Sequence, residues 1–282
     1  KSRGNLFVEV LKDTVPGSPS VQIDTVRQGA SGGPQMMLFA ATGLASLQKE
    51  MGVFDLPYAI RDSAMIEKVV NGPLGDRLLG GLASSGLIGL AWWENGFRQV
   101  TTSIEPHRKV GNFRALRMRV VPEPVFTETF RSLGAAPKAL PASRLHEALR
   151  SGEVEAQEGF DTNILLGRLH EVQQHLWLTN HSYGAIVLAI NSTVWNELSD
   201  EQRQALRDAA VEAGREQRTW AREEVWRIRT LLQAHGMQVH QPSHPTLRAL
   251  LAATEPVRKQ FSATYSPDIR SILPIDSESS RP

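Results

Sequence analysis

The feature that most constrains the fold is an alternation of strand and helix patterns within residues 114–162. Residues 116–121 largely alternate apolar and basic side chains, which predicts a strand that Pro122 ends. A second short apolar run follows at residues 138–140, and residues 142–150 place apolar side chains at helical spacing. A strand, a turn, a strand and a helix in that order predict an α/β unit whose strand ends face a crevice.

Size and charge narrow the possible functions. The 282 residues suffice for two domains of ordinary size, each with its own core. Lysine and arginine total 31 against 30 acidic residues, and the basic residues do not cluster with aromatic ones, so nothing supports a nucleic-acid partner. No apolar run approaches the roughly 20 residues of a membrane span, so direct membrane insertion is not expected. The absence of cysteine excludes disulfides and thiolate chemistry.

The same patterns predict the other elements. Strands are expected at residues 5–11, 36–40, 87–91 and 176–191, and helices at residues 21–28, 63–82 with a break near Pro73, and 245–261. Ser199 and Gln202 have the spacing of a capping box, and a proline-free run continues from them to Leu232. That run predicts a helix on the order of 50 Å long, longer than one domain of this size, so it should extend across both domains. Residues 277–282 have the composition of a disordered tail.

Arg119 is the main candidate for ligand recognition, because it lies at the carboxyl end of the 116–121 strand. Its residue type alone leaves two interpretations open: a solvated charge paired with a glutamate, or a bidentate clamp on a carboxylate. Arg98, taken in isolation, fits a surface residue. Glu155 and Glu158 could form an acid/base pair, although Glu158 is better explained as orienting an arginine or accepting a ligand hydroxyl.

Further candidates lie where predicted strands meet polar loops. Trp93 belongs either to the core or to the wall of a cleft, and Asn180 and Tyr183 either reach the cleft or stop short of it. His181 has no second metal ligand or nucleophile near it in sequence, so we favour a hydrogen-bonded loop histidine over a metal ligand or general base. The chain has no G-x-S-x-G, P-loop, G-x-G-x-x-G or H-E-x-x-H motif, so we expect no enzymatic activity, no cofactor and no metal site.

Several motifs, taken together and in order, resemble one known family. They are G-V-F-D-L-P-Y-A-I-R-D, W-E-N-G-F-R-Q, R-M-R-V-V-P, L-G-A-A-P, L-P-A-S-R-L-H-E-A-L, G-E-V-E-A-Q-E and L-T-N-H-S-Y. Their series resembles the DctP-like solute-binding proteins of tripartite ATP-independent periplasmic (TRAP) transporters. The resemblance extends over residues 4–265.

The resemblance implies a two-lobe α/β fold like that of periplasmic binding proteins, with a hinge cleft and a long helix that spans both lobes. Lobe one is expected at residues 1–97 plus 186–225, and lobe two at residues 98–185 plus 226–282. In the family a first strand and helix precede the segment that begins here at Gly4. We therefore expect the N-terminal part of lobe one to be missing from this chain.

The resemblance also implies the ligand site. The family clamps a ligand carboxylate at the position of Arg119, and Arg98 is expected as a second cationic contact because it matches the family's N-G-x-R. We expect the Arg119 side chain to face solvent in the open crevice. Gly159 and Phe160 stand where family members commonly have Asn-Pro, so the asparagine amide contact is absent and a bulkier or less polar ligand tail becomes possible.

The function implied is capture of a small organic acid in the periplasm and its delivery to TRAP membrane subunits, with the lobes closing on the ligand. Two alternatives use the same scaffold: a carboxylate-sensing ectodomain and a carboxylate-acting enzyme. The acid itself stays open, and a monocarboxylate, a dicarboxylate and a sugar acid all fit the sequence.

Overall fold

The structure is a computed structural model that describes residues 4–11, 15–29, 33–103 and 113–274. The chain forms two compact units. Unit 1 comprises Lys1–Gly52, Asp62–Glu94 and Gly184–Ala221, and unit 2 comprises Val53–Arg61, Asn95–Tyr183 and Arg222–Pro282. The predicted tail at residues 277–282 lies outside the described residues.

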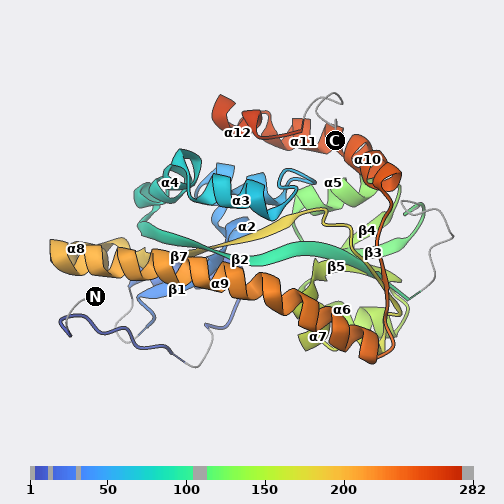
Figure 1. Ribbon diagram of the computed structural model, residues 1–282, viewed down its shortest axis with the longest axis horizontal. Helices are drawn as coiled ribbons and strands as arrows, with labels where there is room; N and C mark the ends of the chain where they lie inside the picture. The colour runs from blue at the N-terminus through green and yellow to red at the C-terminus, as the bar shows by residue number, and fades with distance from the viewer. Residues whose placement is uncertain (1–3, 12–14, 30–32, 104–112, 275–282) are drawn as a thin grey trace. The chain divides into compact units, whose positions relative to one another are not determined.

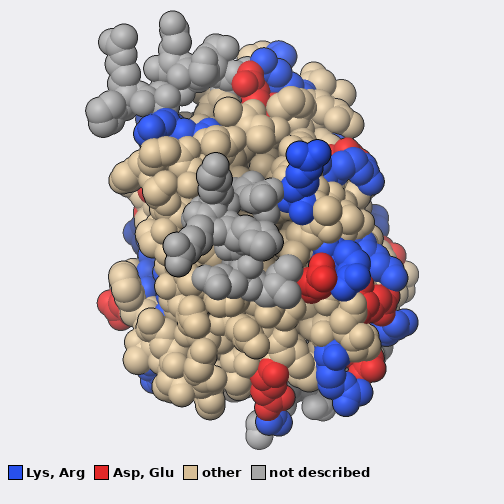
Figure 2. Space-filling model, turned by 90° about the vertical axis from the view of Figure 1, so that its right-hand side faces the viewer, with Lys and Arg blue, Asp and Glu red and all other residues tan. Residues whose placement is uncertain are grey.

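The lobe limits drawn from the sequence stay a prediction. They assign residues 53–61 to lobe one, whereas in the structure these residues group with unit 2. On the face drawn in Figure 2, basic and acidic side chains are intermixed along one side, in keeping with their nearly equal numbers in the sequence.

Unit 1 combines an antiparallel strand pair with several short helices (Figure 1). Its elements are α1 (Pro19–Gln28), β1 (Met36–Ala40), α2 (Ala41–Leu44), part of η1 (Lys49–Asp55), α3 (Ser63–Val70), α4 (Pro73–Gly80), η2 (Ala83–Ser85), the first half of β2 (Leu87–Thr102), most of β7 (Tyr183–Asn191), α8 (Ser192–Glu197) and the first part of α9 (Asp200–Ala234). β1 pairs with β7, with Met36 opposite Ile190. The predicted break near Pro73 is confirmed, because α3 ends at Val70 and α4 begins at Pro73.

Local chemistry explains where these helices begin and end. The Asp62 carboxylate caps α3 by accepting a hydrogen bond from the Met65 backbone N–H at 2.7 Å. Gly29 ends α1 with a φ of 60°, a conformation that glycine adopts without strain. The core of the unit gathers side chains from β2 (Leu87–Thr102), β7, α8 and α9 (Asp200–Ala234); these are Leu90, Ala91, Ile190, Trp195, Leu206 and Ala210.

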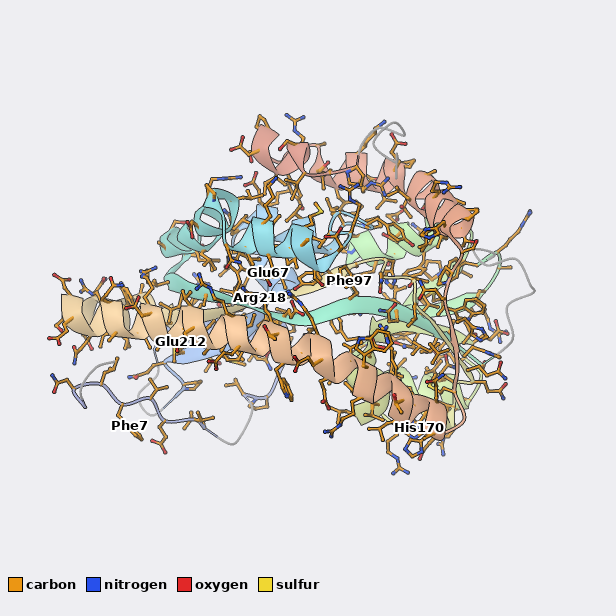
Figure 3. All side chains as sticks on the ribbon, in the orientation of Figure 1. Phe7, Glu67, Phe97, His170, Glu212 and Arg218 are labelled. Carbon is orange, nitrogen blue, oxygen red and sulfur yellow. The ribbon has the colours of Figure 1, made fainter. Side chains whose placement is uncertain are left out.

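The strand predicted at residues 5–11 is not present. Residues 5–11 pair with no strand of the described chain, and Phe7 and Val10 are 87% and 85% exposed. Figure 3 shows Phe7 projecting from this segment. Alternating side chains alone do not make a strand, because the backbone N–H and C=O groups also need hydrogen-bond partners on a neighbouring strand.

Unit 2 is built on a mixed sheet in the order β8–β6–β2–β5–β3–β4. Its strands are the second half of β2, β3 (Arg117–Val120), β4 (Ala136–Ala139), β5 (Ala156–Phe160), β6 (His175–Trp177) and β8 (Gln238–His240). Its helices are α5 (Pro124–Ser132), α6 (Ala142–Arg150), α7 (Asp161–Leu166), η3 (Leu169–Glu171), α10 (His244–Ala253), α11 (Glu255–Ser262) and α12 (Pro267–Ser271). The two strands and the helix predicted from residue 116 to residue 150 are confirmed as β3, β4 and α6, but the connection between the strands is not a turn alone, because it contains the helix α5, which was not predicted.

Two predicted elements are interrupted. The strand expected at residues 176–191 is two strands, β6 and β7, separated by residues 178–182. The helix expected at residues 245–261 is α10 followed by α11, because Pro256 cannot continue the hydrogen-bond ladder of a helix interior and instead occupies the first turn of α11.

The long helix is confirmed. α9 is continuous over 35 residues, about 52 Å at the rise of an α-helix, and Figure 1 draws it without a break. Its capping box is reciprocal: the Gln202 N–H donates to the Ser199 hydroxyl at 3.2 Å, and the Ser199 N–H donates to the Gln202 side chain at 2.9 Å. Residues up to Ala221 belong to unit 1, and the remainder belongs to unit 2.

Candidate functional site

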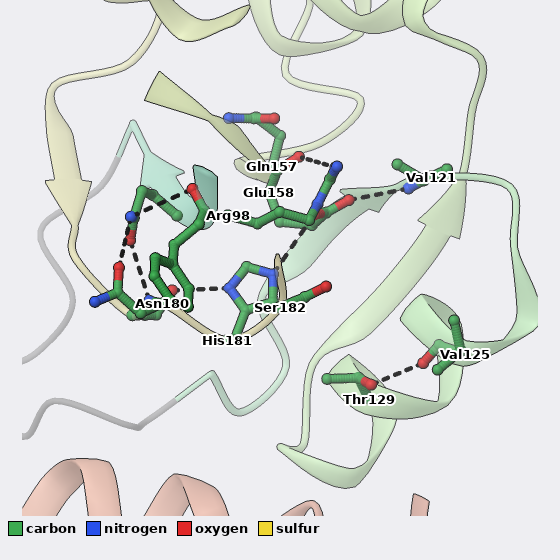
Figure 4. A network of polar contacts seen from close by, with 12 residues as sticks. Arg98, Val121, Val125, Thr129, Gln157, Glu158, Asn180, His181 and Ser182 are labelled. Carbon is green, nitrogen blue, oxygen red and sulfur yellow. Dashed lines mark hydrogen bonds and ion pairs between the residues drawn. The ribbon is translucent and has the colours of Figure 1, made fainter. Parts of the chain in front are cut away.

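A buried ion pair forms the centre of the polar cluster in unit 2. β2 and β5 run antiparallel with Val100 opposite Glu158, so that Arg98 and Glu158 lie on neighbouring strands. The Arg98 Nε donates to Glu158 Oε2, and Arg98 Nη2 lies 3.4 Å from the Glu158 carbonyl oxygen (Figure 4). The Val121 N–H donates to Glu158 Oε1 at 3.2 Å. Glu158 therefore orients an arginine, one of the three roles considered for it.

The electrostatics of this pair are set by burial and charge together. Glu158 is fully buried, and burial alone would raise its pKa. The Arg98 charge and the hydrogen bond from its guanidinium, with the nearby His181 ring, outweigh that cost and hold the pKa of Glu158 well below its usual range. The pair is thus ionised at neutral pH.

The Arg98 guanidinium also lies over two aromatic rings. The Arg98 Cζ lies 4.9 Å from the Phe126 ring centroid and 4.4 Å from the Phe160 ring centroid. Phe160, which stands where the family commonly has proline, is itself buried. Arg98 is consequently fixed in position by a carboxylate and by stacking.

The loop before β7 contributes His181. Its Nδ1 lies 2.8 Å from the Thr179 hydroxyl, and its Nε2 lies 3.5 Å from Glu158 Oε2, close enough for an electrostatic contact but without the geometry of a hydrogen bond. Burial lowers the pKa of His181 and Glu158 only partly opposes this, so we assign a neutral ring. We place its proton on Nε2, facing the carboxylate. The expectation of a hydrogen-bonded loop histidine is confirmed.

Arg119 differs from Arg98 in having no carboxylate partner among the side chains that the structure describes. It lies on β3, and its Nε donates to the Leu140 carbonyl oxygen at 2.8 Å. Neither terminal nitrogen of Arg119 has a hydrogen-bond partner among the residues that the structure describes. Burial lowers the pKa of Arg119. The negative charge of Glu158 raises that pKa, and the positive charge of Arg98 lowers it further. The Arg119 guanidinium nevertheless stays protonated at neutral pH, as arginines in proteins do.

The expectation that Arg119 faces solvent is wrong. The residue is only 5% exposed. Burial changes along β3: Arg117 at its start is exposed, whereas Met118, Arg119 and Val120 are buried, and the Arg119 guanidinium bonds the Leu140 carbonyl oxygen instead of pointing to solvent.

Asn180 is held by hydrogen bonds with the Gln99 amide, a pairing that no sequence pattern predicts. The Gln99 side chain donates to Asn180 Oδ1 at 2.7 Å, and the Asn180 N–H donates to Gln99 Oε1 at 3.1 Å. Asn180 has a φ of 45°, and the pair fixes this left-handed conformation beside His181. Gly159 lies opposite Gln99 on β5, and a Cβ at Gly159 would lie 3.1 Å from Gln157 Oε1.

The remaining candidates are aromatic. Tyr183 is buried and packs edge-to-face on Phe97, with ring centroids 5.1 Å apart. Trp93 belongs to unit 1, whereas the other site candidates belong to unit 2. Its indole Nε1 is buried and has no hydrogen-bond partner in the described structure.

The structure therefore brings Arg98, Glu158, Phe160 and His181 into one cluster and gives Arg119 a separate anchor. Their roles toward a ligand stay predictions. Among the described residues, no group of three or more histidine, aspartate or glutamate side chains could hold a metal ion. The helices of the described chain include none with the length and apolar character needed to cross a bilayer.

Comparison with known proteins gives the family. Residues 1–264 match the model of bacterial extracellular solute-binding protein, family 7 (DctP). The chain is similar to the 2,3-diketo-L-gulonate-binding periplasmic protein YiaO of Escherichia coli K12, at 31% identity over 85% of this chain and 72% of that protein. It is also similar to the C4-dicarboxylate-binding protein DctB of Bacillus subtilis 168, at 26% identity over 99% of this chain and 79% of that protein.

Solved structures share the fold. One is a TRAP periplasmic solute-binding protein from Polaromonas sp. JS666 bound to D-erythronate, with 29% identity and a TM-score of 0.81 over 93% of this chain and 84% of that one. The two-unit α/β architecture predicted from the sequence agrees with this likeness. The chain belongs to family 7 of the bacterial extracellular solute-binding proteins, the solute-binding proteins of TRAP transporters.

Proposed function

We propose that this protein binds a small organic acid by its carboxylate in the periplasm and delivers it to the membrane subunits of a TRAP transporter. The observation that carries the proposal is the state of Arg119. The residue is only 5% exposed and its guanidinium is fixed through Nε, while its two terminal nitrogens have no partner among the described residues. Such a fork matches the two oxygens of a carboxylate in one plane.

Arg98 has an assisting role in this proposal. Glu158 and two aromatic rings already hold its guanidinium, so Arg98 stiffens the site. Burying a ligand carboxylate without a cation costs several kcal/mol, so the free charge has to come from Arg119. The likeness to proteins that bind 2,3-diketo-L-gulonate and D-erythronate supports an organic acid as the ligand. The family supports delivery to a transporter and a periplasmic location.

The test is calorimetric titration of a panel of organic acids into the protein and its Arg119 variants. Because a lysine ammonium is a point charge without the planar fork, Arg119→Lys should fail nearly as badly as Arg119→Ala. Losing one partner of a buried charged pair costs roughly 2–5 kcal/mol, which is about 30-fold to several thousand-fold in affinity.

Arg117 provides a matched control on the same strand. Its side chain is 55% exposed and pairs with Glu155 at 2.9 Å, so Arg117→Ala and Arg117→Lys should bind as the unmodified protein does. Circular dichroism checks that every variant is folded. An Arg119→Lys protein that binds its acid within about threefold of the unmodified protein refutes the clamp.

A further inference from the structure

We infer that the ligand is a monocarboxylate and not a dicarboxylate. The inference rests on the proposed function and deepens it. Its basis is the supply of buried positive charge, because each carboxylate that is buried needs a cation to compensate it. In the part of the chain that the structure describes, the buried arginines are Arg98, Arg119, Arg218 and Arg258.

Arg218 of unit 1 is already neutralised. Its Nε and Nη2 donate to the two carboxylate oxygens of Glu67 at 3.0 and 2.9 Å, a fork-to-fork pair that Figure 3 labels. Its Nη1 donates to the Trp92 carbonyl oxygen at 2.7 Å. This arginine connects α9 to α3 and β2 and has no capacity left for a ligand carboxylate.

Arg258 of unit 2 is saturated by neutral acceptors. Its guanidinium donates to the carbonyl oxygens of Leu251, Pro57 and Pro274 at 2.7, 3.1 and 3.3 Å. It also donates to the Thr254 hydroxyl at 2.8 Å. Nε and both terminal nitrogens are thus used within the protein, and Arg258 serves to hold the 53–61 segment to the C-terminal helices.

Arg119 interacts electrostatically with Glu158 and Arg98 of the cluster, and it adds one positive charge that has no counterion of its own among the described residues. Glu158 offsets the charge of Arg98, and His181 is neutral. Arg119 is therefore the single uncompensated cation among these side chains, and one ligand carboxylate neutralises it. A second carboxylate buried in the same cluster would meet the Glu158 charge without a cation of its own.

Matched acids test this directly. In each pair the far end of the molecule is CH₂OH in the monocarboxylate and COO⁻ in the dicarboxylate: 4-hydroxybutyrate with succinate, D-erythronate with meso-tartrate, and D-galactonate with galactarate. Titration calorimetry near neutral pH should find the monocarboxylate at least about tenfold tighter in the pair that binds best. A dicarboxylate that binds as tightly as its partner, or tighter, overturns the inference. If neither member of any pair binds, the proposed function fails and the inference fails with it.

A charge variant tests the cause. Glu158→Gln keeps the shape of the side chain but removes its charge, so a second positive charge becomes uncompensated and the preference for the monocarboxylate should fall at least about threefold. Glu155→Gln, whose carboxylate is partly exposed and pairs with Arg117, is the matched control and should leave the preference unchanged. If Glu158→Gln prefers the monocarboxylate as strongly as the unmodified protein does, the Glu158 charge is not the cause of that preference. If this variant does not fold, the titrations of the unmodified protein still decide whether the ligand is a monocarboxylate.

Discussion

Removing the Arg98 guanidinium should reverse the sign of the contribution that Glu158 makes to the pH dependence of the unfolding free energy. Arg98→Met keeps a long side chain between Phe126 and Phe160 but leaves a fully buried carboxylate without its cation. Breaking a buried pair in this way costs about 3–5 kcal/mol, which for a protein of this size lowers Tm by about 6 °C or more near pH 7.5.

The sign of the pH effect follows from which state binds more protons. In the unmodified protein the pKa of Glu158 is depressed, so its contribution is present above the unfolded pKa and is lost as pH falls through the folded value. Without Arg98, burial dominates and raises the pKa of Glu158 above its unfolded value. The folded state then binds more protons, and the variant should recover part of its lost stability between about pH 7.5 and 5.5.

The assay is thermal or urea unfolding followed by circular dichroism at both pH values. Arg117→Met is the control, because its exposed pair with Glu155 contributes about 0–1 kcal/mol. The reasoning is refuted if Arg98→Met loses no more stability than Arg117→Met near pH 7.5. It is refuted equally if the gap between Arg98→Met and the unmodified protein stays constant as the pH is lowered.

Three further changes have expected outcomes that urea unfolding can check. Gly214→Ala should cost about 1–3 kcal/mol, because the added Cβ would lie 2.6 Å from the Trp92 carbonyl oxygen. Gly80→Ala, in a helix and with nothing within 4 Å of the added Cβ, should instead stabilise by about 0.4–1 kcal/mol; equal effects of the two changes would contradict the packing argument. Burial lowers the pKa of His170, and the stacked His235 ring, 4.3 Å away, lowers it further, so the unfolded state binds more protons and stability should fall as pH drops from about 7 to 5. His170→Gln should weaken that fall, and an unchanged pH profile would count against it.

Local patterns predicted the elements that depend on local interactions. The apolar spacing of residues 142–150 predicts α6, and the capping box at Ser199 predicts the start of α9, because a helix closes its hydrogen bonds within a few residues. Residues 5–11 have the alternation of a strand and yet pair with none in the described chain. A strand depends on a partner that its own sequence does not specify.

The candidate site was predictable only in part, because its contacts also join segments that are far apart in the sequence. Arg98, Glu158 and Arg119 each follow from a motif in the sequence, but their pairing does not. Arg98 is 60 residues from Glu158, and the strand register that joins them is set by the whole sheet. The amide pair between Gln99 and Asn180 spans 81 residues and has no signal in either segment.

The discontinuous make-up of the two units has a consequence for the synthesis of the protein. Unit 1 starts at Lys1 but needs residues up to Ala221, and unit 2 starts at Val53 but needs residues beyond Arg222. At about 5–20 residues per second on the ribosome, the earliest segments of both units wait on the order of ten seconds or more for their partners. Contacts between such distant segments also form more slowly than local ones. A nascent chain that has not reached Gly184 contains neither unit in full, so the apolar strands already made stay open to aggregation until the second half of the chain arrives.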